Sequence, residues 1–222
     1  MLRATKVRIY PTQEQAEFLI AQFGAVRFAY NKSLHLKSHM YRKHGVILNP
    51  KKDIKPLLAV AKKSRKYHWL KQYDSIALQQ SVINLHQAFD NFFNPKLKAK
   101  YPQFKRRHSK QSSYHCVGVK VLDGAIKLPK MKPVEANIHR EIIGEVKSIT
   151  LSLSNTGKFY ASILADDGAE VPSPIHTVRK VTGVDLGLSH FAIESNGKKT
   201  ANPRFVKRAE KNLRRKQRQL SR

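Results

Sequence analysis

The chain has 222 residues, of which 43 are lysine or arginine and 15 are aspartate or glutamate, and its formal charge at pH 7 is +28. Hydrophobic residues make up 41% of the sequence, which is enough for a core, so the composition excludes a wholly disordered polypeptide. The single cysteine, Cys116, excludes an intramolecular disulfide and a Cys-x-x-Cys zinc site.

No stretch of the sequence has the pattern of a membrane span or a secretory signal. The longest apolar run, residues 57–61, is far below the ~20 residues that a bilayer span needs. Residues 1–6 lack the apolar run of a signal peptide. We therefore expect a soluble, cytoplasmic protein without a membrane partner, and the charge favours association with the nucleoid.

The positive charge is concentrated in two stretches of the chain. Residues 95–110 contain seven lysines and arginines and no acid, and residues 204–222 contain nine with Glu210 as the only acid. Because each neutralised phosphate releases counterions, such stretches favour long polyanions over small acidic ligands. A basic surface kept for solubility and a basic membrane-surface helix are weaker alternatives, since the last stretch has few large apolar residues. Nucleic acid is the expected partner.

The first part of the chain shows a strand pattern and then helix patterns. Residues 5–10 alternate as a half-buried strand does. Thr12 and Gln15 have the spacing of a capping box, which predicts a helix closed by Gly24 and a second helix over 25–43 that stops at Gly45. Residues 49–66 contain two prolines and predict a loop with a short helix.

The clearest helix begins after Asp74, a candidate N-cap, and ends before Pro95. Its apolar residues recur at spacings of four and three, which places them on one face as core. These residues are Leu78, Val82, Leu85, Phe89 and Phe92. The opposite face is rich in amides, which suit nucleic-acid contacts and water equally. Its members are Gln79, Gln80, Asn84 and Gln87.

From residue 113 onward the pattern has the period of two that is typical of strands. Alternation over 148–154 and a second run over 159–164, with a turn at residues 155–158 between them, predict a hairpin in a small antiparallel sheet or barrel. Asp123–Gly124 marks another turn. The acidic, proline-containing residues 166–174 predict a linker.

Two further strands are predicted after the linker, around Asp185 and over residues 190–195, and Asn196–Gly197 is the dipeptide best suited to a two-residue type I′ turn. Two tightly joined strands with a carboxylate on the first are how the RNase H fold begins, where such carboxylates hold metal ions. An aspartate between Gly183 and Gly187 is equally explained by a bulge or a turn.

Taken together and in order, several segments resemble the TnpB (OrfB) family of insertion-sequence transposase-associated proteins, which are similar to the type V CRISPR effectors. The resemblance covers nearly the whole chain. It rests on residues 7–12 (VRIYPT), 24–31 (GAVRFAYN), 69–70 (WL), 77–80 (ALQQ), 101–105 (YPQFK), 126–129 (IKLP), 183–187 (GVDLG) and 212–222.

The resemblance implies an α+β fold in which a helical recognition domain is inserted in a small antiparallel, wedge-like β-barrel, followed by the start of an RNase H-like (RuvC) domain. The implied bounds are 1–12 for the first barrel strand, 13–105 for the recognition domain, 106–174 for the remainder of the barrel and 175–222 for the RuvC fragment.

The resemblance also implies guide RNA and a double-stranded DNA target as partners, with base pairing reading most of the target. The start of the helix after Asp74 matches the part of the family that reads a short motif beside the target, and glutamine suits adenine there. The nucleic-acid-binding residues that we expect are Ser75, Ile76, Gln79, Gln80, Arg27, Asn31, Lys105, Arg106, Arg107, Arg214 and Arg215.

Asp185 matches the first catalytic aspartate of the family, whose nuclease depends on Mg²⁺. The later Glu and Asp of that site and the cysteine-rich zinc element have no counterpart in these residues, so we expect a C-terminally truncated nuclease domain and no zinc site. Since a two-metal site needs carboxylates on both sides of the phosphate, Asp185 is expected to hold Mg²⁺ only if another part completes the site.

The sequence therefore predicts a TnpB-like, transposase-associated protein that binds guide RNA and DNA and does not cut DNA by itself. One alternative is an RNA-guided DNA endonuclease completed by a separate C-terminal partner chain, and another is a generic basic RNA-binding protein. Tyr101, Phe104 and Tyr114 suit base stacking and core anchoring about equally. His35 and His39 suit a polar surface pair better than a metal site.

Overall fold

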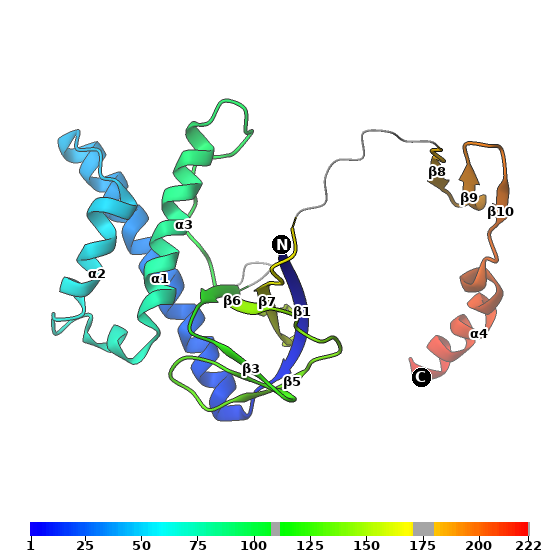
Figure 1. The fold of residues 1–222 in the computed structure, drawn as a ribbon, viewed down its shortest axis with the longest axis horizontal. Coiled ribbons are helices and arrows are strands. Elements are labelled where there is room, and N and C mark those ends of the chain that lie inside the picture. The colour runs from blue at the N-terminus through cyan, green and yellow to red at the C-terminus, as the bar shows by residue number, and fades with distance from the viewer. Residues whose placement is uncertain (108–111, 171–179, 222) are drawn as a thin grey trace. The chain divides into compact units, whose positions relative to one another are not determined.

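The computed structural model describes residues 1–107, 112–170 and 180–221 and divides into two compact units, residues 1–171 and residues 172–222 (Figure 1). The predicted linker over 166–174 lies partly outside the described residues. None of the helices in the described ranges combines the length and the apolar content that crossing a bilayer requires.

The first unit is built on a seven-stranded sheet in the order β2-β6-β7-β1-β5-β4-β3, in which every pairing is antiparallel. The strands are β1 (Leu2–Tyr10), β2 (Ser112–Cys116), β3 (Lys120–Leu122), β4 (Ala125–Lys127), β5 (Val134–Asn137), β6 (Glu145–Leu153) and β7 (Phe159–Asp166). The predicted mixture of helices and antiparallel sheet is confirmed. Among the described strands β2 and β3 are the two edges, so the sheet is not seen to close into a barrel.

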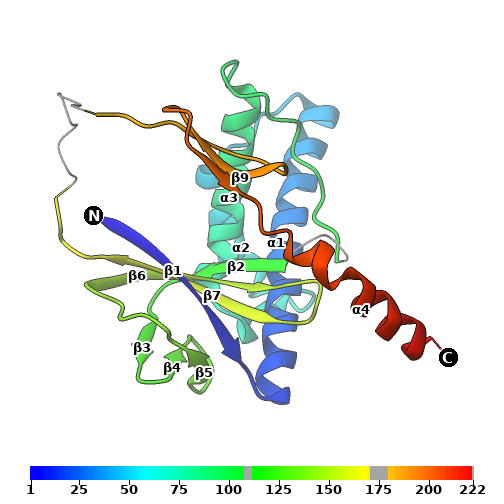
Figure 2. The ribbon, with the colours of Figure 1, turned by 90° about the vertical axis from the view of Figure 1, so that its right-hand side faces the viewer.

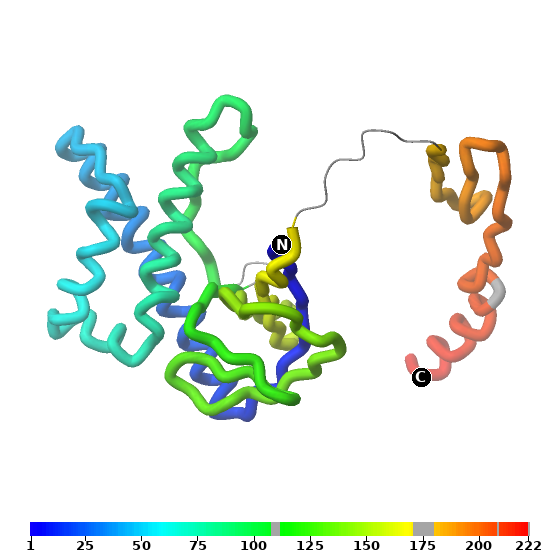
Figure 3. Tube along the Cα trace, in the orientation of Figure 1, coloured from blue at the N-terminus to red at the C-terminus, as the bar shows by residue number. Residues whose placement is uncertain are grey.

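The predicted hairpin is confirmed as β6 and β7, whose residues pair from Leu153 opposite Phe159 to Glu145 opposite Asp166. The turn between them closes through Ser154 N, which donates to the carbonyl of Lys158 at 2.9 Å, and it places Gly157 at φ +73°. The chain's first strand, β1, lies between β7 and β5 in the middle of the sheet, and the helices that follow β1 lead in sequence to the edge strand β2. Figure 3 traces this path from the blue N-terminal strand through the helices and back to the sheet in green.

Helix α1 (Gln13–His44) begins at the predicted capping box, in which Gln15 N donates to the Thr12 hydroxyl and Thr12 N to the Gln15 side chain. It ends at Gly45 with φ +66°. The predicted stop at Gly24 is wrong, because one helix runs through it. Phe23 and Val26 on either side are buried, and packing of this face outweighs the helix cost of a glycine, about 1 kcal/mol.

The remaining helical segments of this unit are η1 (Pro50–Ile54), α2 (Lys55–Ala61), η2 (His68–Gln72) and α3 (Ser75–Phe93). Asp74 caps α3 as predicted, by accepting from Ile76 N. Of the predicted apolar stripe, Leu78, Val82, Leu85 and Phe89 are buried, and Phe92 is partly buried. Helices α1 and α3 run alongside one another (Figure 2), and Tyr30 and Leu34 meet Leu85 and Phe89 between them.

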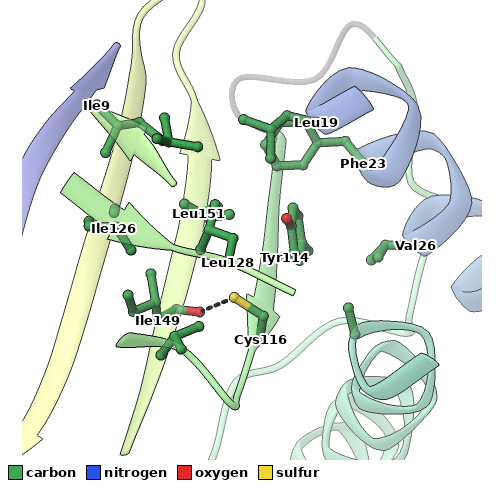
Figure 4. Close-up of a cluster of buried hydrophobic side chains, with 14 of the residues drawn as sticks. Ile9, Leu19, Phe23, Val26, Tyr114, Cys116, Ile126, Leu128, Ile149 and Leu151 are labelled. Carbon is green, nitrogen blue, oxygen red and sulfur yellow. Dashed lines mark hydrogen bonds between the residues drawn. The ribbon is translucent and has the colours of Figure 1, made fainter. Parts of the chain in front are cut away.

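The main core lies between the sheet and the helices (Figure 4). The Phe23 ring of α1 meets the edge of Tyr114 in β2, with ring centroids 5.4 Å apart. The Cys116 thiol donates to the carbonyl of Ile149 at 3.4 Å, and burial raises the pKa of this thiol to about 12. Cys116 is therefore a core residue with no reactive thiolate at neutral pH.

The second unit contains β8 (Val184–Leu186), β9 (His190–Glu194) and β10 (Lys199–Ala201) in the order β10-β9-β8, followed by α4 (Phe205–Leu220). The predicted strands are present, but the type I′ turn is wrong. Only Gly197 has a positive φ there, and its N–H donates to the carbonyl of Glu194 at 2.8 Å. The connection is thus a turn followed by a left-handed glycine, the three-residue alternative to a type I′ hairpin.

Substitution by alanine should have opposite effects on the free energy of unfolding at two glycines, Gly24 and Gly144. At Gly24 an added Cβ meets nothing closer than 3.9 Å, so Gly24→Ala should raise the free energy of unfolding by roughly 0.5–1 kcal/mol. At Gly144, with φ +91°, an added Cβ would lie 2.0 Å from the carbonyl oxygen of Asp166. Gly144→Ala should lower the free energy of unfolding by at least about 1–3 kcal/mol. Urea unfolding of both variants checks this, and stabilisation by both would contradict the described backbone.

Candidate nucleic-acid interface

The start of α3 is held in place by α1 and by the residue that follows α2. The backbone N–H of Asp74 donates to the Gln22 side chain of α1 at 2.9 Å, and the Asp74 carboxylate accepts from Ile76 N at 2.9 Å. The Lys62 ammonium, just after α2, donates to the Ser75 hydroxyl at 2.6 Å. Partial burial and the charge of Lys130 lower the pKa of Lys62. This helix end is therefore fixed relative to the rest of the unit.

The next residues of α3 face away from the core. Ile76 is 46% exposed, Gln79 is exposed, and Gln80 is partly buried. The Gln80 amide donates to the Asn84 side chain at 3.1 Å, one turn further along the helix. An exposed apolar side chain is thus followed by a row of amides on a rigid helix start.

A groove of about 250 Å³ lies beside these amides. Gln80 and Asn84 of α3 line it, and so do His115 of β2, its cross-strand partner Thr150 of β6, and Lys105. Burial lowers the pKa of His115, so its imidazole is neutral at pH 7 and offers one donor and one acceptor. The groove is therefore lined mainly by neutral hydrogen-bonding groups, with one cation at its margin.

Lys105 is held by Asn31 of α1 through both ends of its amide. Asn31 Nδ2 donates to the Lys105 carbonyl at 3.0 Å, and its Oδ1 accepts from Lys105 N at 2.8 Å. The Lys105 ammonium lies 4.4 Å from the centre of the Tyr30 ring, and its partial burial lowers the pKa of Lys105. The amide of Asn31 is thus engaged with the backbone, and its role in the structure is to position Lys105.

The charges of two further expected cations, Arg27 and Arg107, influence one another. Arg27 of α1 donates to the Ser112 hydroxyl at 2.9 Å, and its pKa is lowered by burial and then by the charge of Arg107. Arg106 and Arg107 are exposed. The two guanidinium groups repel one another, and no acid is among the causes of the lowered pKa of Arg27. An anion bound between them would therefore be stabilised.

The expected residues therefore fall into groups. Gln80 and Lys105 share one groove, and Arg27 with Arg107 forms a second position in the same unit. Arg214 and Arg215 are exposed on α4 in the other unit, where Arg214 donates to Glu210 at 2.6 Å.

His115 and Thr150 were not expected as site residues. The alternation of β2 contained the signal for His115, since the neighbouring Tyr114 and Cys116 are buried and His115 points to the other face. No local pattern marked Thr150, which reaches the groove through its pairing with β2.

Asp185 is exposed on β8, where it lies opposite Ile193 of β9. The nearest carboxylate in sequence, Glu194, lies opposite Val184 and so faces the other side of the sheet. Glu194 already accepts from the Asn196 amide at 2.9 Å. Within the described ranges no group of three or more His, Cys, Asp or Glu could hold a metal ion, so these residues do not fit a two-metal centre.

Comparison with protein families places residues 1–45 in a family described as a helix-turn-helix domain, HTH_OrfB_IS605. In this chain the matched residues form β1 and the continuous α1. A Salmonella dublin protein named "Virulence protein VsdF" is 72% identical over 116 residues, which is 50% of this chain and 98% of that protein.

Two longer relatives match the chain from end to end. A Streptomyces pristinaespiralis protein named "Putative RNA-guided DNA endonuclease" is 31% identical over 99% of this chain and 54% of its own length. An Escherichia coli K12 protein named "Putative RNA-guided DNA endonuclease InsQ" is also 31% identical, over 100% of this chain and 54% of its own length. The chain thus spans about half the length of these two relatives.

A solved structure was also found, titled as a complex of Cas12f1 with sgRNA and target DNA. It is 12% identical, has a TM-score of 0.39, and the match covers 100% of this chain and 62% of that one.

The lowered pKa of His115 predicts a pH dependence of stability. The unfolded chain takes up a proton near the ordinary pKa of about 6.5, whereas the folded imidazole resists it. The contribution of His115 to stability is therefore full above pH 6.5 and is lost as the pH falls below it. The difference in unfolding free energy between pH 7 and pH 5 should be smaller in His115→Gln than in the wild type, as measured by urea unfolding. An equal difference in both proteins would contradict the partly buried, neutral imidazole.

Proposed function

The chain belongs to the TnpB/OrfB family of transposase-associated proteins, and from this premise we propose that it binds guide RNA and a double-stranded DNA target. The observation that carries the proposal is the amide-lined groove at the start of α3, bordered by Lys105 and adjacent to an acid-free basic stretch. Neutral donors and acceptors suit base edges, and the surrounding cations suit phosphates.

The start of α3 is the proposed reader of a short motif beside the target. Gln79 and Gln80 each carry an amide that can pair with N6 and N7 of adenine in the major groove, and the exposed Ile76 side chain suits the methyl group of thymine. The Ser75 hydroxyl can serve either base, although Lys62 contacts it in the free protein. The hydrogen bonds from Asp74 N to Gln22 and from Lys62 to Ser75 support this role. They fix the start of α3, and a helix that reads bases must keep its position relative to the DNA.

The proposed phosphate contacts surround this reader. Lys105, Arg106 and Arg107 follow one another in a segment without acids, and the charge of Arg107 acts on Arg27. Asn31 acts on the backbone by holding Lys105. Arg214 and Arg215 supply a second basic surface on α4 for the RNA or the displaced strand.

We assign the parts of the chain accordingly. Residues 1–12 and 106–174 correspond to the wedge-like sheet domain, and residues 13–105 form the recognition domain inserted in it. Residues 175–222 correspond to the start of the RuvC domain. The entry of β1 between β7 and β5 supports this division, because the helices leave and return to one sheet.

For the nuclease reaction we propose that residues 1–222 by themselves bind without cutting. Asp185 corresponds to the first catalytic carboxylate of the family and would be one ligand of Mg²⁺. Glu194 lies on the other face of the sheet from Asp185, so it would not be a second ligand. The alternative is a nuclease in which carboxylates outside these residues complete the site. The names of the two relatives that match the chain from end to end favour that alternative over a generic RNA-binding protein.

The reader is tested by selecting duplexes from a library with a randomised segment beside a fixed target, in the presence of RNA that copurifies with the chain. Replacing Gln79 and Gln80 by alanine should lower the preference for the selected base pairs by roughly tenfold or more, since one bidentate pair contributes about 1–3 kcal/mol of discrimination. Gln87→Ala is the matched control, because Gln87 is an exposed amide further along α3. Equal losses in both variants, or no sequence preference in the wild type, would favour the generic RNA-binding protein.

Cutting is tested with the same RNA, a labelled target duplex and Mg²⁺. Residues 1–222 should bind the duplex and leave it intact. Adding a polypeptide that carries the remainder of an end-to-end relative should produce cleavage that Asp185→Asn abolishes, if the completed nuclease is correct. If residues 1–222 alone cleave the target at a specific site and Asp185→Asn abolishes this cleavage, the proposal that they do not cut is wrong.

A further inference from the structure

A second groove lies away from the start of α3, between the C-terminal halves of α1 and α3 and the segment that follows α3. Its volume is about 700 Å³, within the range of roughly 300–1,000 Å³ that is typical of ligand sites. Phe89, Phe92 and Phe93 of α3 line it, together with Tyr41 of α1, Tyr101 and Phe104. None of these six residues lines the amide groove.

One wall of this groove is rigid. The Tyr101 ring meets Phe89 and Phe92 edge-on, with centroids 5.5 Å and 5.4 Å away and interplanar angles of 86° and 85°. Its hydroxyl lies 3.0 Å from the Ser38 hydroxyl of α1. Phe89 is buried between α1 and α3. The wall is therefore organised before any ligand arrives.

The remaining rings of the groove are exposed. Phe93 is 69% exposed, Tyr41 is 60% exposed and Phe104 is 55% exposed, and all three lie outside the two hydrophobic clusters formed by the described residues. Large aromatic side chains left in water beside a preformed wall mark a binding surface rather than a packed core.

The charge around the groove determines what can occupy it. Lys37 and Arg42 line it together with the rings, and no lining residue is an acid. The Lys37 ammonium lies 4.8 Å from the Phe89 ring, and the acid that acts on it, Asp53, already accepts from Asn49 N at 2.7 Å. Residues 91–107, which include one side of the groove, contain no acid. A second copy of this chain would bring cations against cations, whereas a polyanion with apolar rings would be attracted.

We propose that this groove binds unpaired nucleobases of single-stranded nucleic acid, which stack on Phe93, Phe104 and Tyr41 while Lys37 and Arg42 contact the phosphates. Aromatic platforms within a basic surface are how single strands are held without sequence preference. The inference extends the proposed function, since both need a nucleic-acid partner, but it rests on different residues from the reader in α3.

The test compares the full chain with the Phe93→Ala/Phe104→Ala and Tyr41→Ala variants. Fluorescence anisotropy measures binding of labelled oligouridine, of oligodeoxythymidine and of a duplex, each about 12 nucleotides long. We expect single-strand affinity to fall by about tenfold per ring removed, with duplex affinity unchanged. Because these rings are exposed, the melting temperature should not change. The RNA and DNA arms show which strand the groove prefers.

Two controls separate stacking from charge and from general apolar contact. Ile47→Ala removes a 75% exposed lining side chain that has no ring, and it should lower the single-strand affinity by much less than the removal of a ring does. Arg42→Gln should reduce the slope of log Kd against log salt concentration by about one, whereas the ring variants should shift the affinity without changing the slope. Oligonucleotides containing 5-iodouracil should crosslink to Phe93, Phe104 or Tyr41 on irradiation.

Several outcomes would overturn the inference. Equal losses for duplex and single strand, no loss in the ring variants, or crosslinks confined to other segments would each exclude base stacking here. A wild-type dimer in sedimentation that the Phe93→Ala/Phe104→Ala variant dissociates would show that the groove binds a second copy instead. If the reader in α3 keeps its sequence preference while the ring variants have no effect, this inference fails and the proposed function stands.

Discussion

Helix α1 packs its buried face against the sheet and α3, and nearly every proposed contact surface is positioned from it. Gln22 holds the backbone of Asp74 at the start of α3, Arg27 contacts Ser112, and Asn31 holds Lys105. Further along, Ser38 lies in hydrogen-bonding distance of Tyr101 in the wall of the aromatic groove. Because these contacts recur every one to two turns along a single helix, α1 sets the spacing between the amide groove and the aromatic groove.

The second constraint is charge. A chain with a formal charge of +28 repels itself, and the described ion pairs engage few of its cations. In the first unit the cations whose pKa is lowered are those that packing brings near the rings or near each other, namely Arg27, Lys37, Lys62 and Lys105. Such groups regain favourable interactions when a phosphate arrives. These four cations are therefore the positions at which the proposed polyanion would be stabilised most.

The second unit shows how topology limits chemistry. Alternation along a strand places successive side chains on opposite faces, so Asp185 and Glu194 cannot share a ligand even though β8 and β9 are paired. The proposed nuclease reaction would therefore need carboxylates from other elements beside Asp185.

The sequence by itself determined the features that depend on neighbours within a few residues. The capping box of Thr12 and Gln15, the cap at Asp74, the stripe from Leu78 to Phe89 and the hairpin over residues 148–164 follow from local hydrogen bonding and periodicity, and all are confirmed. Charge and the family segments also indicated nucleic acid as the partner.

The continuity of α1 through Gly24 depends on tertiary structure, because burial of Phe23 and Val26 outweighs a local helix propensity of about 1 kcal/mol. The groove that joins Gln80 to His115, Thr150 and Lys105, and the open groove between Phe93 and Phe104, were also decided there, since these residues are distant in sequence and meet only when α1, α3 and the sheet pack together.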